Sequence, residues 1–450
     1  MHNKFIRFFS LDGDKVSLEQ LLEARENRVL LQQQCLQQYG QTLLSVTLLA
    51  VGEVKKNALL DYVFEKALSS LSILFQQLNI QPTAEFIRPF NTGHEALFVL
   101  PIDAKQLKKL TIELEDSSAL ARLWDIDVID SRGQLLSRTE FNIPPRPCLI
   151  CSENAKSCAR SRKHTLNEIY TEIQRRARTF YLAENISESV YQALLKEVYL
   201  TPKPGLVDRS NNGAHNDMNV RTFERSAVAL RPFFTQFVLK GIATANLPVK
   251  QILTQIRPLG LQAEKAMFQA TNNVNTHKGA IFAFGLVCTA IGRLFEQKTD
   301  INHTNICQLV AQFAQGLTTE LQHYSANQPL TAGIMLYREY GLTGARGEAE
   351  SGFGTIHPVL AEYTNQKIEN DEIWLRILLK IIAKNNDTNV VHRGGINALY
   401  WVQNEAKRLL NDEDFNLKNL HSFDNACIHK NISCGGSADL LALTIFLLNL

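Results

Sequence analysis

Glycines alternate with charged side chains in the run GLTGARGEAESG, which spans residues 341–352. Glycine lets the backbone approach a ligand closely and exposes N–H groups to anions. Arg346 provides a cation for phosphate, and Glu348 and Glu350 provide carboxylates for a metal ion or for proton transfer. The composition indicates a ligand-binding loop, and the alternative is a solvated connection between two helices.

Segments of the same character recur along the C-terminal part of the chain. They are 199–218, 275–285, 385–395 and 433–444. Each joins or opens a predicted helix, and the free N–H groups and dipole of a helix N-terminus favour an anion. The candidate binding residues, with Gly347 from the first run, are Lys203, Asp208, His215, His277, Lys278, Asp387, Gly435, Gly436 and Asp439. A capping role is the alternative for Asp387 and Asp439, as is a structural role for both histidines. Together these segments predict a large, phosphate-rich ligand.

A second acidic motif lies in the N-terminal part, in the predicted strand ARLWDIDVI. Strand alternation places Asp125 and Asp127 on one face, a spacing that can hold Mg²⁺ for phosphoryl or nucleotidyl transfer. Arg122 adds a phosphate-type cation beside them. An exposed edge strand would show the same alternation.

A cysteine-rich connector follows this strand. Its Cys-x-x-Cys pair, Cys148 and Cys151, matches half a zinc site, and Cys158 with His164 could complete a tetrahedron. The spacing of the second pair is not that of a standard finger. Reduced thiols in a basic connector and redox chemistry are the alternatives.

The length and composition of the chain limit the number of domains, the partners and the compartment that we expect. A chain of 450 residues is expected to form two or three domains, and its formal net charge of +2 gives no general electrostatic case for nucleic-acid or membrane binding. The N-terminus has no apolar signal core, and the apolar stretch 440–450 is too short to span a bilayer. Eight dispersed cysteines suit reduced thiols. We therefore expect a soluble cytoplasmic protein.

The elements that position the motifs differ between the two parts of the chain. Residues 1–164 are predicted to be α+β, a small mixed sheet with helices, possibly of nucleotidyltransferase-like type. A capping box at Ser17 opens a helix that stops near Gly40. Strands are predicted at 42–50, 96–100 and 123–129.

Residues 165–450 show long helical periods and are predicted to form a mainly all-α domain. Helices are predicted at 166–183, 188–200, 221–241, 249–271, 279–296, 304–323, 371–384, 394–410 and 437–448. The domain boundary is placed in the Pro-, Cys- and Arg-rich connector 144–164.

The motifs also resemble those of two known families. The segments between 199 and 444 resemble the triphosphoribosyl-dephospho-coenzyme-A synthase family over roughly residues 187–450. LLEARENR (residues 21–28), NTGHEA (residues 91–96), RLWDIDV and the cysteine connector resemble the apo-citrate-lyase phosphoribosyl-dephospho-coenzyme-A transferase family. The whole chain resembles a natural fusion of the two. Ala121 and Cys434 stand where glycine and proline would be expected, and neither change removes a charged group.

The resemblance implies two successive reactions. In the first, the helical domain transfers the triphosphoribosyl part of ATP to the ribose 2′-hydroxyl of dephospho-coenzyme A and releases adenine. In the second, the N-terminal domain moves the phosphoribosyl-dephospho-coenzyme-A unit to a serine of the citrate lyase acyl carrier protein and releases pyrophosphate. Glu348, Glu350 and Asp387 are then expected to be catalytic in the first reaction, and Arg122, Asp125 and Asp127 in the second, with Mg²⁺.

Two other functions fit the same residues. A metal-dependent nucleotide hydrolase would release adenine without dephospho-coenzyme A as acceptor. A non-catalytic carrier-protein adaptor held together by zinc would release neither adenine nor pyrophosphate.

Overall fold

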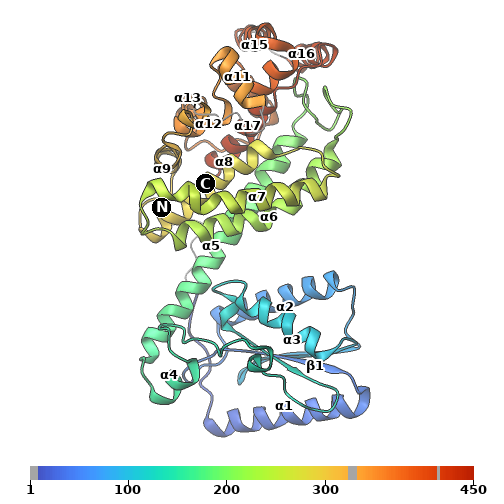
Figure 1. Ribbon diagram of the computed structural model, residues 1–450, viewed down its shortest axis with the longest axis vertical. Coiled ribbons are helices and arrows are strands. Elements are labelled where there is room, and N and C mark those ends of the chain that lie inside the picture. Colours follow the sequence, from blue (N-terminus) through green and yellow to red (C-terminus); the bar gives the residue numbers. More distant parts are fainter. Residues whose placement is uncertain (1–8, 323–331, 413–415) are drawn as a thin grey trace. The chain divides into compact units, whose positions relative to one another are not determined.

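The computed structural model describes residues 9–322, 332–412 and 416–450 (Figure 1). The chain divides into two compact units, Met1–Leu182 and Ala183–Leu450. Helix α5 (Leu166–Tyr199) begins in unit 1 and ends in unit 2. The division lies inside this helix and not in the connector before Thr165, because Ile173 and Ala177 of α5 belong to the core of unit 1.

Unit 1 is built on a four-stranded sheet with the strand order β2-β3-β1-β4. Its strands are β1 (Thr42–Leu48), β2 (Ala84–Phe90), β3 (Gly93–Leu100) and β4 (Trp124–Ile129). The α+β class is confirmed, although every pairing is antiparallel and not mixed. The register places Asp127 of β4 opposite Ser45 and Asp125 opposite Thr47.

The two faces of the sheet have different partners. Leu44, Val46, Phe98, Ile126 and Val128 share one face and belong to the main core of unit 1. Helices α2 (Ala58–Gln77) and α3 (Ala104–Asp116) supply the other side of this core. The opposite face carries both aspartates, since alternate residues of a strand point to opposite sides.

Helix α1 (Leu18–Tyr39) lies against the face that carries the aspartates. The predicted capping box is confirmed at its start, where Ser17 and Gln20 exchange hydrogen bonds, and it ends at Gly40 with φ 59°. Cys35 and its apolar neighbours pack on Leu43, Leu97, Val99 and Ile129, which lie toward one end of the strands. Toward the other end this face is polar, and the aspartates lie there.

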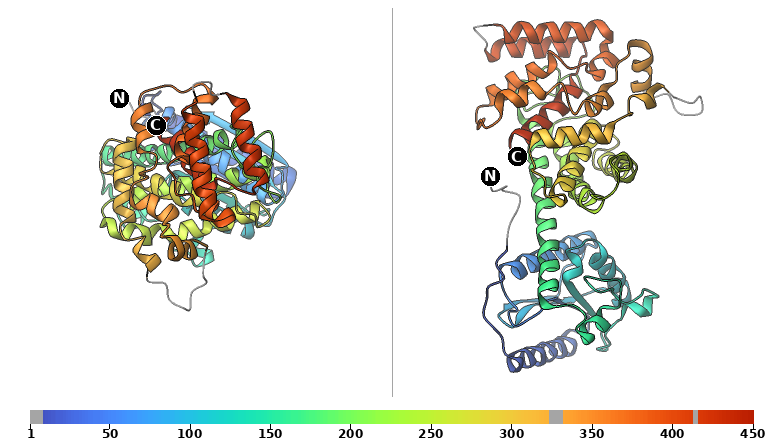
Figure 2. Two further views of the ribbon diagram at one scale, coloured as in Figure 1. Left: turned by 90° about the horizontal axis from the view of Figure 1, so that it is seen from above. Right: turned by 90° about the vertical axis from the view of Figure 1, so that its left-hand side faces the viewer.

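All regular elements in the described residues of unit 2 are helices, as predicted (Figures 1 and 2). After α5 the helices are α6 (Val220–Ala243), α7 (Ile252–Ala270), α8 (Lys278–Glu296), α9 (His303–Ala314), α10 (Thr319–Gln322), α11 (Ala332–Tyr340), α12 (Gly344–Glu350), α13 (His357–Tyr363), α14 (Asp371–Ile382), α15 (Thr388–Leu410), α16 (Leu417–His429) and α17 (Gly435–Leu448).

Helix α8 lies at the centre of this unit. It is the one helix of the described residues that is long and apolar enough to cross a membrane, and 78% of that window is buried inside the protein, as in a core helix. A Cβ at Gly241 of α6 would lie 2.1 Å from the Thr289 carbonyl, and one at Gly292 would lie 2.0 Å from the Val238 carbonyl. The two helices therefore pack with their backbones in close contact, which explains both glycines.

Several elements differ from the sequence-based prediction. Helix α5 is continuous where two helices were predicted, because its polar middle residues do not interrupt the helical backbone. The predicted helix 304–323 is broken between α9 and α10, and its last residue lies outside the described residues. The glycine-rich run 341–352 contains the short helix α12 and is not a loop throughout. Strand β2 and helices α2 and α3 had not been predicted.

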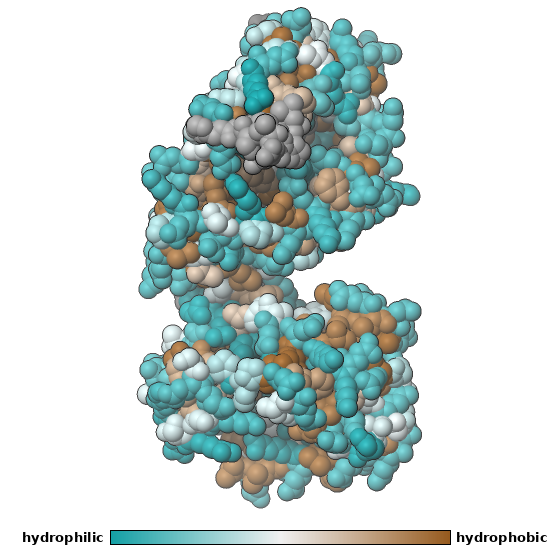
Figure 3. All heavy atoms as spheres, viewed as in Figure 1, coloured by the Kyte–Doolittle hydropathy of each residue, from teal (hydrophilic) through white to brown (hydrophobic). Residues whose placement is uncertain are grey.

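The surface of the protein differs in polarity from the apolar cores of the two units. On the face shown in Figure 3, hydrophilic residues predominate in both units.

Candidate active sites

A cavity of about 790 Å³ in unit 2 brings the five polar segments together. Every one of these segments contributes to its lining. The predicted residues in the lining are Lys203, His215, His277, Lys278, Arg346, Glu348, Asp387, Gly435, Gly436 and Asp439. Its size suits a nucleotide-sized ligand. Asp208, Gly347 and Glu350 lie outside the lining.

The N-terminus of α17 is occupied by a carboxylate of the protein itself. Asp387 caps α15 through the Asn389 N–H, and it also accepts hydrogen bonds from the N–H groups of Gly436 and Ser437, at 3.2 and 2.8 Å. A Cβ at Gly436 would lie 2.9 Å from the Asp387 carboxylate, so the glycine permits this close approach. Asp387 thus joins two helix N-termini, which supports the capping alternative for this residue.

The segment 199–218 is organised by buried carboxylates. Asp208 accepts hydrogen bonds from the backbone N–H groups of Lys203, Ser210 and Asn211, and so shapes the turn. Lys203, which is 1% exposed, forms an ion pair with Glu197 at 2.5 Å. Glu197 had not been singled out in the sequence, because it lies within an ordinary helical period.

His215 lies in a chain of three side chains at the cavity wall. Arg393 donates to its Nδ1 at 3.0 Å, and its Nε2 lies 2.9 Å from the Ser433 hydroxyl. Arginine can only donate, so Nδ1 must be the acceptor and Nε2 must carry the proton. Burial and then Arg393 lower the pKa of His215, and Asp217 opposes them. The structure therefore indicates a neutral His215 of defined tautomer.

His277 and Asp439 lie near the start of α8. His277 bonds the Ser226 hydroxyl through Nδ1 at 2.7 Å, whereas its buried Nε2 has no hydrogen-bond partner among the described residues. Burial and then Lys203 lower its pKa to about 3, so it is neutral. Burial, Glu197 and Asp387 raise the pKa of Asp439 well above its usual value, which favours a protonated carboxyl group.

The two glutamates of α12 have different surroundings. Glu348 lines the cavity and accepts a hydrogen bond from the Thr355 hydroxyl at 2.6 Å. Glu350 points elsewhere and accepts hydrogen bonds from the Gly316 N–H at 2.7 Å and from the Thr318 N–H and hydroxyl. Arg346 is 40% exposed and lies 3.8 Å from Glu320, so its guanidinium remains available to a ligand.

In unit 1, Asp125 and Asp127 form a second candidate site on the polar part of the sheet. Burial and then Asp125 raise the pKa of Asp127, as expected for two carboxylates held close together. The same face carries Glu95 of β3, which forms ion pairs with Arg28 of α1 and Arg88 of β2, each at 2.9 Å. The site thus combines carboxylate ligands with several cations.

Two arginines lie close to β4, one just before the strand and one in the connector. The predicted Arg122 donates to the Pro147 carbonyl at 2.6 Å. Arg146, which had not been predicted, contacts Asp125 at 3.3 Å and Glu115 more closely. Lys108 and Glu115 of α3 bond the Ile126 backbone. These two charged residues lie seven apart on the same side of the helix as its apolar residues, and that spacing was the available signal.

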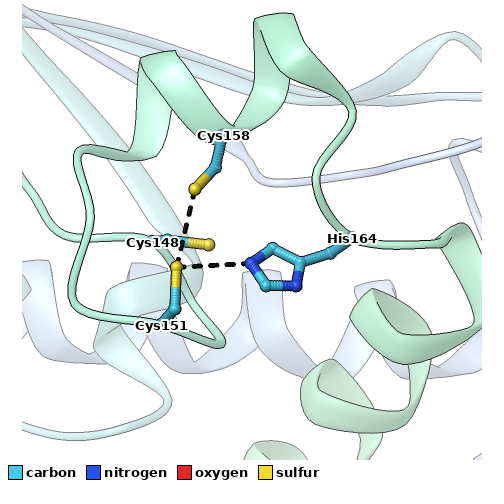
Figure 4. A group of neighbouring side chains, drawn as sticks. All are labelled: Cys148, Cys151, Cys158 and His164. Atoms are coloured by element: carbon cyan, nitrogen blue, oxygen red, sulfur yellow. Dashed lines mark hydrogen bonds between the residues drawn. The ribbon is translucent and has the colours of Figure 1, made fainter.

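The connector brings its three cysteines and histidine together (Figure 4). The ligand atoms of Cys148, Cys151, Cys158 and His164 all lie within 4.8 Å of one another. The Cys151 sulfur is 3.5 Å from the Cys158 sulfur and 3.3 Å from the His164 Nε2. Tetrahedral zinc with Zn–S bonds of about 2.3 Å separates two sulfurs by about 3.8 Å. The donor set and spacing therefore fit zinc.

Comparisons with known proteins give the same two-part organisation. Residues 16–180 match the family CitX, apo-citrate lyase phosphoribosyl-dephospho-CoA transferase. Residues 183–450 match the family CitG, ATP:dephospho-CoA triphosphoribosyl transferase. These two families define a transferase with two different units, and the matches meet at the division inside α5.

Full-length relatives carry both units. The chain is 58% identical to the Protein CitXG of Haemophilus influenzae over 99% of this chain and 98% of that protein. It is 34% identical to the Protein CitXG of Leuconostoc mesenteroides subsp. cremoris, over 97% and 98% respectively. It is 56% identical to a 2-(5''-triphosphoribosyl)-3'-dephosphocoenzyme-A synthase of Haemophilus ducreyi, over 67% of this chain and 99% of that protein. The chain belongs to the family of CitX–CitG fusion proteins.

Proposed function

We propose that this transferase makes the citrate lyase prosthetic group in unit 2 and attaches it in unit 1. The observation that carries the first activity is the convergence of five polar segments on one cavity in the unit that matches CitG. ATP and dephospho-coenzyme A are the proposed substrates. The 2′-hydroxyl oxygen of dephospho-coenzyme A forms a bond to C1 of the ATP ribose, the bond from that carbon to adenine breaks, and the hydroxyl proton is lost to a base.

The cavity provides groups for each part of this reaction. Arg346 and Lys278 lie in its lining and are the proposed contacts for the triphosphate. Asp439, with its raised pKa, is the proposed proton donor to the departing adenine. Glu348 is the proposed carboxylate near the developing positive charge of the ribose.

The second activity is placed on the sheet face of unit 1. The carrier serine oxygen forms a bond to the phosphorus nearest the ribose, the bond from that phosphorus to the bridging oxygen breaks, the serine proton is lost to a base, and pyrophosphate leaves. Asp125 and Asp127 offer the oxygen ligands that Mg²⁺ prefers, and Mg²⁺ bound there would offset triphosphate charge. Arg28, Arg88 and Arg146 lie on the same side as further cations.

The proposal also includes a structural zinc ion and a cytoplasmic location. The cluster of Cys148, Cys151, Cys158 and His164 supplies four protein ligands, as closed structural zinc sites do. All eight cysteines are free in the structure, which suits a reducing compartment. The partner is the apo acyl carrier protein of citrate lyase.

One assay tests the function directly. The purified protein is incubated with ATP, Mg²⁺ and dephospho-coenzyme A, and adenine is measured; apo carrier protein is then added, and pyrophosphate and the carrier mass are measured. We expect adenine only when dephospho-coenzyme A is present, and pyrophosphate only after the carrier is added. Adenine release without dephospho-coenzyme A would identify a hydrolase instead.

The zinc proposal has its own measurement. Elemental analysis of carefully purified protein should find about one zinc per chain, and Cys151→Ser should lose it. Cys35→Ser is a matched control, because Cys35 lies on α1 outside the cluster. Purified protein that contains no metal would show that these cysteines are reduced thiols and not zinc ligands.

A further inference from the structure

The connector that carries the four metal ligands also carries Arg146, two residues before Cys148. The Arg146 guanidinium reaches three acceptors on unit 1. It donates to the Trp124 carbonyl at 2.7 Å, to the Asp125 carboxylate at 3.3 Å, and to the Glu115 carboxylate. Its side chain is 17% exposed, so these contacts are mostly shielded from water.

These contacts lie along the outer edge of β4, which is the last strand of the sheet. The Ile126 N–H donates to Glu115 at 2.9 Å, and the Ile126 carbonyl accepts from Lys108 at 3.0 Å. Arg146 donates to the Trp124 carbonyl, the next one on this outer edge, two residues before Ile126. An edge strand exposes unpaired backbone groups, so these side chains take the place of a further strand. Arg146 thereby fixes the edge and places a cation beside Asp125.

The backbone of Arg146 is tied to the metal cluster. Its carbonyl accepts a hydrogen bond from the N–H of Ala155, the first residue of α4 (Ala155–Ser161), at 3.1 Å. The same helix carries Cys158. A helix of seven residues is not stable on its own, and Cys158 is its one buried residue. Bonds from the four ligands to one ion would hold this short segment in place.

We infer that zinc held by Cys148, Cys151, Cys158 and His164 acts on the attachment reaction by fixing the position of Arg146 against Asp125 and the edge of β4. Arg146 is then a positioning residue, and zinc is needed for attachment but not for adenine release. This inference rests on the zinc site and on the placement of attachment on β4, both proposed above.

A double-mutant cycle tests it in the full-length protein. Arg146→Gln, Cys151→Ser and the double variant are compared for zinc content, attachment rate and adenine release. Arg146→Gln should keep zinc and lower the attachment rate at least tenfold, and Cys151→Ser should lose zinc with a similar loss of rate. The double variant should be no slower than the slower single variant, because both changes act through one contact. A double variant whose loss of attachment rate equals the product of the two single losses would overturn the inference.

Further readouts separate positioning from a loss of fold. Adenine release should stay at the wild-type rate in all three variants. The Mg²⁺ concentration that gives half the maximal attachment rate should shift in the same direction in Arg146→Gln and in Cys151→Ser, because both alter the charge beside Asp125. Failure of either variant to shift it would contradict the positioning role.

A matched control is Arg132→Gln, since Arg132 forms an exposed ion pair with Asp130 just after β4 and does not belong to the connector. It should leave zinc and both rates unchanged. Absence of zinc from the wild-type protein would refute the proposed metal site. Zinc with independent, multiplicative effects would refute the present inference alone.

Discussion

Two glutamates in one short helix allow a direct test of how the structure divides activity from stability. Glu348 lines the cavity, whereas Glu350 holds the backbone at Gly316 and Thr318. The same substitution, glutamate to glutamine, is therefore expected to have opposite effects at two positions only two residues apart. Glu348→Gln should abolish adenine release and lower stability less than Glu350→Gln does, because among the described residues the Glu348 carboxylate accepts hydrogen bonds from Thr355 alone. Glu350→Gln should lower stability and leave the activity of the folded protein intact.

The magnitude follows from the hydrogen bonds of Glu350. Its two oxygens accept from the Gly316 N–H, the Thr318 N–H and the Thr318 hydroxyl. Glutamine keeps one side-chain oxygen and replaces the other with an NH₂ group. That NH₂ group faces N–H or O–H donors and cannot accept from them, so about one charge-assisted hydrogen bond is lost and a backbone N–H is left unpaired. We expect a loss of about 1–3 kcal/mol in the free energy of unfolding. For a unit the size of Ala183–Leu450 that corresponds to about 2–5 °C in Tm.

The pH dependence of stability gives an independent check. Burial would raise the pKa of Glu350, but the hydrogen bonds from Thr318 and Gly316 outweigh it and lower the pKa below 4.5. A carboxylate with a lowered pKa in the folded state contributes stability that is present above pH 4.5 and lost as the pH falls through the folded pKa. Glu350→Gln should remove this part of the acid destabilisation.

The assay combines calorimetric unfolding with adenine release by chromatography, measured on both variants and on Thr318→Ala. Thr318→Ala removes one donor to Glu350 and should lower Tm with normal turnover. A stable but inactive Glu350→Gln, or an active Glu348→Gln, would show that the division between the two glutamates is wrong.

The remaining predictions concern both units. Asp125→Asn combined with Asp127→Asn should stop attachment to the carrier serine, measured by carrier mass, yet leave adenine release unchanged; loss of adenine release in a folded variant would mean that the two reactions share a site. Arg346→Ala should raise the KM for ATP at least tenfold, which corresponds to about 1.4 kcal/mol of binding, and an unchanged KM would place the triphosphate elsewhere. Because burial lowers the pKa of His277 to about 3, its contribution to stability should be lost as the pH falls below 6.5. His277→Asn should then flatten the loss of stability of the protein between pH 6.5 and about 3, as measured by unfolding at several pH values, and an equally steep loss would contradict a buried neutral histidine.

The sequence by itself determined the fold class, the two-part organisation and the segments that form the sites. Periodicity and capping signals act over a few residues, so the helix opened by Ser17 and the strand that carries Asp125 and Asp127 could be predicted locally. The Cys148–His164 cluster was also visible, because its ligands lie within one short connector.

Only the tertiary structure decided which groups meet. The contact from Arg393 to His215 and the hydrogen bonds of Asp387 to α17 depend on how the helices of unit 2 pack. Glu348 and Glu350 look equivalent in the sequence, but Glu350 contacts Gly316 and Thr318 from a distant segment, whereas Glu348 contacts the nearby Thr355. The local sequence pattern predicts which side of a helix or strand a residue occupies. The element that packs against that side comes from a distant part of the sequence, and burial of apolar surface between the two elements determines which one it is.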